Sequence, residues 1–250
     1  TIVATVSDDR RLHGLQLAPL EAAKPLAPWP PPAYADPKSF EEQEVTLETG
    51  TRSVPGTISL PRGSSGARAA VVLLAGSGSL DRDETVGRNK PLKDIAWGLA
   101  SNGVIALRFD KVTYTHATDL KDAHDITLAE EYLPQAIAAI RLLQRHPAVD
   151  PTRIFLLGHS LGGTVAPRIA AAEPTVAGLI LLAGSTRSFE DLIVEQNLHN
   201  LSLDGPLTPR DEAQMESVRK LANRIKSFTP ADIGSETMVL GAPPSYWLDL

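Results

Sequence analysis

Ser160 lies in a sequence pattern that can turn a serine hydroxyl into a nucleophile. The segment Gly158-His159-Ser160-Leu161-Gly162 matches Gly-x-Ser-x-Gly, in which the serine occupies a sharp turn between a strand and a helix. The flanking Gly158 and Gly162 must be small because the strand and the helix crowd the backbone there. An apolar run leads into the turn and a helical pattern leads out of it. We therefore expect Ser160 to be the attacking residue, with an idle serine in a glycine-rich turn as the alternative.

A serine nucleophile also needs donors for the negative charge that develops on the substrate oxygen. The segment Ala75–Ser79 (AGSGS) follows an earlier apolar run, and its glycines allow the backbone to approach a substrate closely. We expect the backbone amides of Ser77 and Leu161 to form an oxyanion hole, the latter at a helix N-terminus. A phosphate-binding loop is the alternative, but this segment lacks both Gly-x-Gly-x-x-Gly spacing and Gly-Lys-Ser/Thr.

The base that would activate Ser160 is not identifiable. For a nucleophile at such a turn the chain order is Ser, then Asp or Glu, then His, and His199 is the one histidine after Ser160. His199 falls inside a predicted helix, where a solvent-facing or packing role is expected. His159 adjoins the nucleophile but points in a different direction. The other histidines, His13, His116, His124 and His146, precede the turn. His116 and His124 follow a central strand, where they could border the pocket.

The acidic partner of the base is equally open. Glu190 and Asp191 follow an apolar run, a position that can hold such an acid, and Asp249 has no histidine after it. We therefore expect the acid and the histidine to lie beyond Leu250, in a C-terminal segment or a companion chain outside these 250 residues.

The elements that must position these residues alternate between strand and helix. Continuous apolar runs, typical of strands covered on both faces, occupy residues 69–75, 104–109, 154–157 and 178–183. Helical spacing covers residues 91–101, 127–146 and 161–172. This alternation predicts an α/β fold with a mostly parallel central sheet and flanking helices. Two antiparallel strands at the sheet edge are expected at residues 45–49 and 54–60.

The alternation ends after residue 183. Residues 188–200 look helical, and Thr208-Pro209 followed by Asp211 predicts the start of another helix. Two helices with no strand between them favour a cap over the sheet, with ordinary crossover helices as the alternative. A single strand after Ser160 would also leave an unpaired apolar sheet edge. This is the second reason to expect the last strands beyond Leu250.

The sequence divides into four parts. Residues 1–24 hold two apolar stretches around a polar turn and predict a hairpin that belongs to something separate from the main domain. Residues 25–39 are rich in proline and predict an extended linker. The α/β core is expected at 40–186, and the helical cap at 187–250, with the core incomplete at its C-terminal end.

Composition excludes several other classes of function. The length of 250 residues with 42% hydrophobic content suits one large core, and a net charge of −6 offers no basic face to a nucleic acid. Because cysteine is absent, no disulfide or thiolate metal site can form, and we expect no metal and no organic cofactor. No apolar run reaches the ~20 residues of a membrane span. No signal peptide is visible, but the chain begins at Thr1, so its compartment stays open.

Four segments make the sequence similar to bacterial carboxylesterases of the EstD type, within the α/β-hydrolase superfamily. They are Gly76–Pro91 (GSGSLDRDETVGRNKP), Arg108–Lys111 (RFDK), Asp150–Ile154 (DPTRI) and Gly158–Gly163 (GHSLGG). The resemblance implies a serine esterase with Ser160 as its nucleophile and a small-molecule ester, short-chain or aryl, as its substrate. It also implies an N-terminal accessory domain, of which residues 1–24 would be the last hairpin.

Four charged residues follow the expected oxyanion loop, and two roles are open to them. Asp81, Arg82, Asp83 and Glu84 either line the pocket or form an ion-pair network that fixes the loop, and the network is the favoured interpretation. The favoured function is cleavage of carboxylic esters through an acyl-enzyme on Ser160. The alternatives are a thioesterase or peptidase with the same nucleophile, and a non-catalytic binding protein that keeps the fold.

Overall fold

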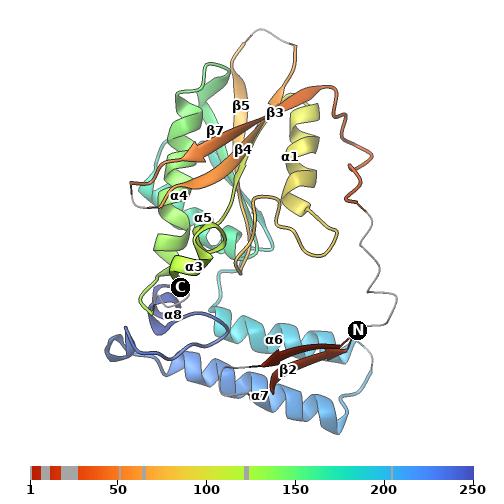
Figure 1. Ribbon diagram of the computed structural model, residues 1–250, viewed down its shortest axis with the longest axis vertical. Helices are drawn as coiled ribbons and strands as arrows, with labels where there is room; N and C mark the ends of the chain where they lie inside the picture. Colours follow the sequence, from red (N-terminus) through yellow and green to blue (C-terminus); the bar gives the residue numbers. More distant parts are fainter. Residues whose placement is uncertain are drawn as a thin grey trace.

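The computed structural model describes residues 2–6, 12–17, 28–50, 52–63, 66–120, 124–203 and 205–250. Its centre is a six-stranded sheet with the order β3-β4-β6-β5-β7-β8 (Figure 1). The strands are β3 (Phe40–Leu47), β4 (Val54–Pro61), β5 (Arg68–Leu74), β6 (Ile105–Phe109), β7 (Val149–His159) and β8 (Gly178–Leu182). The strands β6, β5, β7 and β8 are parallel, whereas β4 pairs antiparallel with both β3 and β6. The predicted α/β fold is confirmed.

Strand β5 shows why its apolar run is continuous. Val71 and Leu73 pack on one face of the sheet with helix α1 (Pro91–Ser101), while Val72 and Leu74 belong to the larger cluster on the other face. Helices α4 (Leu128–Gln144) and α5 (Leu161–Ala172) cover that second face. A strand that is covered on both faces has no polar side to expose. Two short helices, α2 (Val112–Thr115) and α3 (Ala117–Leu120), connect β6 toward α4.

Strand β8 differs from the other parallel strands. Its apolar run predicts a strand covered on both faces, and this prediction is wrong: Leu179, Ile180, Leu181 and Leu182 are 37–47% exposed. The reason is its place at the end of the sheet. Within the described residues β8 pairs with β7 alone, and its outer edge and much of both faces are left uncovered. The expected unpaired apolar edge is therefore present.

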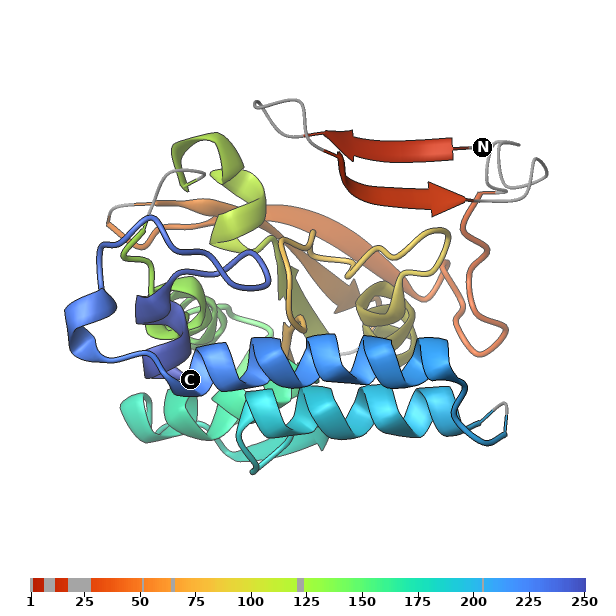
Figure 2. The same cartoon turned by 90° about the horizontal axis from the view of Figure 1, so that it is seen from below.

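Only helices follow β8 in the described part of the chain. They are α6 (Phe189–Ser202), α7 (Pro209–Lys226), the 3-10 turn η2 (Pro230–Asp232) and α8 (Pro244–Asp249). Helices α6 and α7 lie side by side, as Figure 2 shows. Thr208 caps α7 in a reciprocal capping box with Asp211. Of the helices described, none combines the length and the hydropathy that a bilayer crossing requires.

The N-terminal part contains a separate two-stranded antiparallel sheet, β1 (Ile2–Val6) and β2 (Leu12–Leu17). Residues 18–27, which include the start of the predicted linker, lie outside the described residues. The rest of that segment contacts α1: the Trp29 ring meets Trp97 edge-on at 4.8 Å, and Trp29 Nε1 donates to Asp94 Oδ1 at 2.8 Å. The proline-rich segment is thus fixed to the core by its tryptophan.

Candidate active site

Ser160 occupies the connection between β7 and α5 in a backbone conformation that few non-glycine residues adopt. Its φ is 51° and its ψ is −118°, a strained combination of the kind that costs ~1–3 kcal/mol. Two backbone hydrogen bonds hold the turn. Ser160 N donates to Leu182 O at 2.8 Å, and Thr164 N donates to Ser160 O at 3.0 Å. The neighbouring strand and the first turn of the helix therefore fix the serine in place.

The glycines around this turn are required by backbone packing. A Cβ at Gly158 would lie 2.3 Å from Gly162 O, and a Cβ at Gly162 would lie 2.5 Å from Leu74 O. Neither separation is compatible with a side chain. A Cβ at Gly76 would lie 3.3 Å from the Ser160 Cβ. The loop after β5 thus passes directly against the serine.

A cavity of about 470 Å³ opens beside this turn. Ser77 and Leu161 both line it, whereas Ser160 itself does not. The remaining wall is largely apolar and comes from α6 and from the segment around α8: Phe189, Ile193, Leu240, Tyr246 and Trp247. Because α6 contributes two of these side chains, the helices after β8 form part of the cavity wall.

The amides of Ser77 and Leu161 are free to donate. In the described part of the chain neither amide gives a hydrogen bond to another group. Leu161 begins α5, and the first amides of a helix have no partner within it. The structure thus places the two predicted oxyanion residues on one cavity with unused donors.

Gly76, the residue before Ser77, is held by buried polar side chains at both its N–H and its carbonyl group. Gly76 N donates to Glu84 Oε1 at 2.8 Å, and Gly76 O accepts from Lys111 Nζ at 3.0 Å. The Tyr132 hydroxyl lies 2.8 Å from the same carbonyl oxygen. Burial lowers the pKa of Lys111, although its contact with a carboxylate opposes this, and burial raises the pKa of Tyr132 well above its ordinary value.

Glu131 of α4 connects this peptide to the cavity. Lys111 Nζ lies 3.1 Å from Glu131 Oε2, and that oxygen also accepts from the Tyr246 hydroxyl at 2.6 Å. The Thr113 hydroxyl donates to the other oxygen at 2.6 Å. Burial, together with this carboxylate, raises the pKa of Tyr246. The cavity wall and the Gly76 peptide therefore share one buried hydrogen-bond network.

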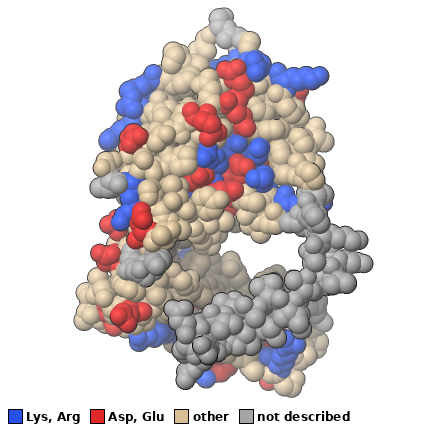
Figure 3. Space-filling view, viewed as in Figure 1, with Lys and Arg blue, Asp and Glu red and all other residues tan. Residues whose placement is uncertain are grey.

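The charged segment after the loop forms an ion-pair network, as favoured from the sequence. Arg82 Nε donates to Asp110 Oδ1 at 2.9 Å, and Asp83 accepts from Arg108 at 2.8 Å and from Lys90 at 2.9 Å. Burial alone would raise the pKa of Asp83, but these hydrogen bonds hold it below its ordinary value. Figure 3 shows acidic and basic side chains side by side on this face of the molecule.

None of the histidines whose side chains are described lies in position to act as a base at Ser160. His159 Nδ1 lies 2.8 Å from Glu84 Oε1, His116 Nε2 lies 2.8 Å from Ser53 O, and His199 is exposed on α6. No described histidine makes a hydrogen bond with the Ser160 hydroxyl, and none lines the 470 Å³ cavity. The side chain of His13 lies outside the described residues.

Two of the acids that follow β8, Asp191 and Asp249, are used elsewhere. Asp191 is exposed and pairs with Lys226 of α7, and this hydrogen bond lowers the pKa of Asp191. Asp249 accepts from Ala129 N at 2.7 Å and pairs with Arg168 at 2.8 Å. Both carboxylates join secondary-structure elements and neither lines the cavity.

Sequence reasoning missed three residues that contact the Gly76 peptide. From the sequence, Glu84 is grouped with its charged neighbours, Lys111 stands out only as part of the segment Arg108–Lys111, and Tyr132 carries no signal. One signal was present: a lysine placed directly after an apolar strand near the expected site requires a buried partner. The identity of that partner depends on the packing of α4 over the sheet.

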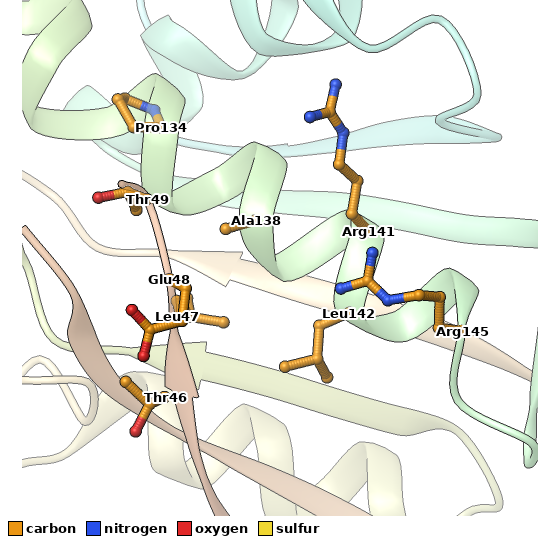
Figure 4. A pocket seen from close by; sticks show the side chains of 9 residues that line it. All are labelled: Thr46, Leu47, Glu48, Thr49, Pro134, Ala138, Arg141, Leu142 and Arg145. Atoms are coloured by element: carbon orange, nitrogen blue, oxygen red, sulfur yellow. The ribbon is translucent and has the colours of Figure 1, made fainter. Parts of the chain in front are cut away.

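A second cavity lies away from the Ser160 turn. It measures about 440 Å³ between the end of β3 and the outer face of α4, where Leu47 faces Leu142 and two arginines stand one turn apart (Figure 4). It contains none of the predicted site residues. Across the described ranges no cluster of three or more His, Asp or Glu side chains is arranged to hold a metal ion.

Comparison with known proteins gives one family and two informative relatives. The model of the alpha/beta hydrolase family matches residues 71–248. Esterase EstD of Thermotoga maritima is 36% identical over 219 residues, which cover 88% of this chain and 48% of that protein. A probable 2-oxo-3-(5-oxofuran-2-ylidene)propanoate lactonase of a Bradyrhizobium species is 36% identical over 96 residues, or 36% of this chain and 38% of that protein.

The chain spans about half the length of the esterase and less of the lactonase. Among solved structures, the alpha/beta hydrolase GrgF from Penicillium sp. sh18 is 20% identical with a TM-score of 0.49. That match covers 84% of this chain and 72% of GrgF.

Proposed function

Because this chain belongs to the alpha/beta hydrolase family, we propose that it is a serine hydrolase that cleaves carboxylic esters through an acyl-enzyme on Ser160. The observation that carries the proposal is the strained turn at Ser160 beside a cavity lined by Ser77 and Leu161, whose amides are unused. The similarity to esterase EstD over 88% of the chain supports an ester as the class of substrate.

The reaction proceeds in two halves. The Ser160 hydroxyl attacks the ester carbonyl carbon while a base takes its proton, and the resulting oxyanion accepts hydrogen bonds from the Ser77 and Leu161 amides. Collapse of this intermediate expels the alcohol, which receives the proton, and leaves the acyl group on Ser160. Water then attacks the acyl carbon, its proton passes through the same base to Ser160, and the carboxylic acid leaves.

The base and its acidic partner are assigned to residues outside those described here, in a further segment or a companion chain. Two observations support this. No described histidine reaches the Ser160 hydroxyl, and the apolar outer edge of β8 is unpaired within the described residues. A parallel strand added at that edge would end on the side of the sheet where Ser160 lies, since the carboxyl ends of parallel strands share one side.

The test is covalent labelling of the full-length gene product with a fluorophosphonate. Ser160 Oγ is expected to bond to phosphorus with loss of fluoride, and the adduct to be found on the peptide that contains Ser160. Ser160→Ala is expected to lose labelling and the hydrolysis of p-nitrophenyl esters together. Ser217→Ala, which removes an exposed hydroxyl on α7, is the matched control and should keep both.

A non-catalytic binding protein is the second candidate, and the absence of a base among the described residues favours it. A folded full-length protein that neither labels nor turns over esters would support this candidate and contradict the first. Thioesters and amides that carry the same acyl group as a reactive p-nitrophenyl ester separate the esterase from a thioesterase or a peptidase. Rising acyl length in the same assay defines the acyl group that the cavity prefers.

A further inference from the structure

Glu84 connects the loop before Ser77 to the turn that carries Ser160. A single oxygen makes both contacts: Glu84 Oε1 accepts from Gly76 N at 2.8 Å and lies 2.8 Å from His159 Nδ1. Gly76 and His159 immediately precede the two site residues in sequence. Since a carboxylate can only accept, the contact with His159 requires the proton on Nδ1. One buried atom thus bridges the two backbone segments that must act together.

Lys111 holds the same residue at its carbonyl group, which belongs to the next peptide, between Gly76 and Ser77. Its Nζ donates to Gly76 O at 3.0 Å, beside the Tyr132 hydroxyl at 2.8 Å. The Gly76 carbonyl and the Ser77 N–H belong to one planar trans peptide, in which they point in opposite directions. A fixed carbonyl therefore fixes the direction of the Ser77 N–H. An ammonium group on the carbonyl also polarises the peptide and strengthens its N–H as a donor.

We propose that Glu84 and Lys111 are positioning residues for oxyanion binding. Glu84 sets the spacing between the Ser77 loop and the Ser160 turn, and Lys111 sets the direction of the Ser77 amide. This inference rests on the proposed function of Ser160. Neither side chain lines the cavity, so both act through the backbone of Gly76, Glu84 at its N–H and Lys111 at its carbonyl.

The backbone at Glu84 supports a positioning role. Its φ is 56°, in a region that glutamate rarely occupies, and its side chain is almost fully buried. The chain is therefore bent in an unfavourable way in order to bring a carboxylate to Gly76. Strained residues of this kind concentrate at functional sites.

The neighbouring Asp81 provides a matched control. It accepts from Thr85 N at 2.8 Å and from the Thr85 hydroxyl at 2.6 Å, so it also makes two strong hydrogen bonds within this loop. Among the described residues its side chain makes no hydrogen bond to Gly76 or to the Ser160 turn, and its backbone carbonyl, which accepts from Glu84 N at 3.0 Å, is kept in an alanine variant. If Glu84 merely stabilised the loop, Asp81→Ala and Glu84→Ala would have the same effect on catalysis.

The first experiment compares Glu84→Ala, Glu84→Gln and Asp81→Ala in the full-length gene product with a p-nitrophenyl ester. Glu84→Ala is expected to lower kcat by about 100-fold with KM within about 3-fold, because a displaced oxyanion donor acts on the transition state. Glu84→Gln should recover much of kcat, since its amide oxygen can accept from the same two donors. Asp81→Ala should stay within a few-fold of the parent. Equal losses in the two alanine variants, or a change confined to KM, would overturn the proposal.

The second experiment does not depend on turnover. The backbone amide resonance of Ser77 is expected to shift in Glu84→Ala and to stay unchanged in Asp81→Ala. It is also expected to shift in Tyr132→Phe, which removes one hydrogen bond of the Gly76 carbonyl and one of Lys111 Nζ. If the parent protein shows no ester hydrolysis, the proposed function fails, and this resonance still tests the positioning roles. A Ser77 amide that is unmoved in both variants overturns them.

Discussion

The Nζ of Lys111 lies 3.1 Å from Oε2 of Glu131, and the two side chains are only 2% and 4% exposed. The pair joins the end of β6 to helix α4 beside Gly76, whose carbonyl accepts from Lys111. Water cannot compensate either charge at this depth, so each group depends on the other and on the hydroxyls around it. Removing only one of these two side chains should therefore destabilise the protein strongly, because it leaves the other charge buried without a partner.

Lys111→Met is expected to destabilise the protein by about 3–5 kcal/mol, because it leaves the Glu131 carboxylate buried without its cation. Urea unfolding followed by circular dichroism measures the loss. The double variant Lys111→Met/Glu131→Gln should recover part of it, since glutamine is neutral and can still accept from Thr113 or Tyr246. A double variant that is as unstable as the sum of the two single variants would contradict the coupling.

Gly162→Ala is expected to destabilise the protein by about 1–3 kcal/mol or more, because the new methyl group would overlap Leu74 O at 2.5 Å. Gly98→Ala is the control. Its methyl group would meet the ring of Tyr34, an exposed side chain that can move aside, and alanine gains up to about 1 kcal/mol of helix propensity in α1. Comparable unfolding midpoints for the two variants would show that a methyl group at Gly162 can be accommodated without loss of stability.

If the proposed acyl-enzyme forms on Ser160, Ile193→Ala is expected to shift the acyl preference of the reaction toward longer chains. The substitution removes apolar volume from the cavity wall, and a methylene group in an apolar pocket is worth roughly 1–3 kcal/mol. The ratio of kcat/KM for adjacent p-nitrophenyl esters should change by about 10-fold. Val194→Ala shortens the next residue of α6, which faces α7 instead, and an equal shift in that variant would exclude the 470 Å³ cavity as the acyl site.

From the lowered pKa of Asp83 we predict how the stability of the protein changes at low pH. Hydrogen bonds from Arg108 and Lys90 hold this pKa below its ordinary value despite burial. A carboxyl group with a lowered folded-state pKa stabilises the fold above its unfolded pKa of about 3.9, and this contribution is lost as the pH falls through the folded-state value.

Asp83→Asn should therefore be less stable than the parent at pH 7, and the two unfolding midpoints should converge as the pH falls from 7 to below about 4. Glu236→Gln, which changes an exposed carboxylate on a loop, is the control and should follow the parent across this range. Parallel curves for Asp83→Asn and the parent would show that the ion pairs of Asp83 do not contribute to stability.

Much of the fold followed from the spacing of apolar residues. Helices α1 and α5 begin and end where their sequences predict, because Pro91 starts one helix and the turn at Ser160 starts the other. The parallel strands were identified for the same reason: a strand buried on two faces needs an unbroken apolar run. Strand β8 has the same apolar run but is exposed. An apolar run shows that a strand has side chains suited to burial, but it does not show which element packs against them.

The site was predictable only in part. Ser160, Ser77 and Leu161 are predicted site residues because a strand–helix turn and a glycine loop have local signatures. The partners of Gly76 have none: Glu84, Lys111 and Tyr132 come from three separate elements. Their convergence depends on strand order and on helix placement. Likewise, α8 closes the cavity from a short segment with too few residues to show a helical period.

The exposed strand β8 has a consequence for the behaviour of this polypeptide in solution. Residues 179–182 present apolar side chains beside a row of backbone donors and acceptors that no described strand occupies, which is the arrangement that recruits extended segments of other chains. Self-association should therefore increase with concentration in any preparation that leaves this strand bare. A lysine at Ile180 would suppress it by adding charge to the edge. Residues 179–182 thus belong to the sheet that supports the Ser160 turn, and they make the protein prone to aggregate until another segment covers them.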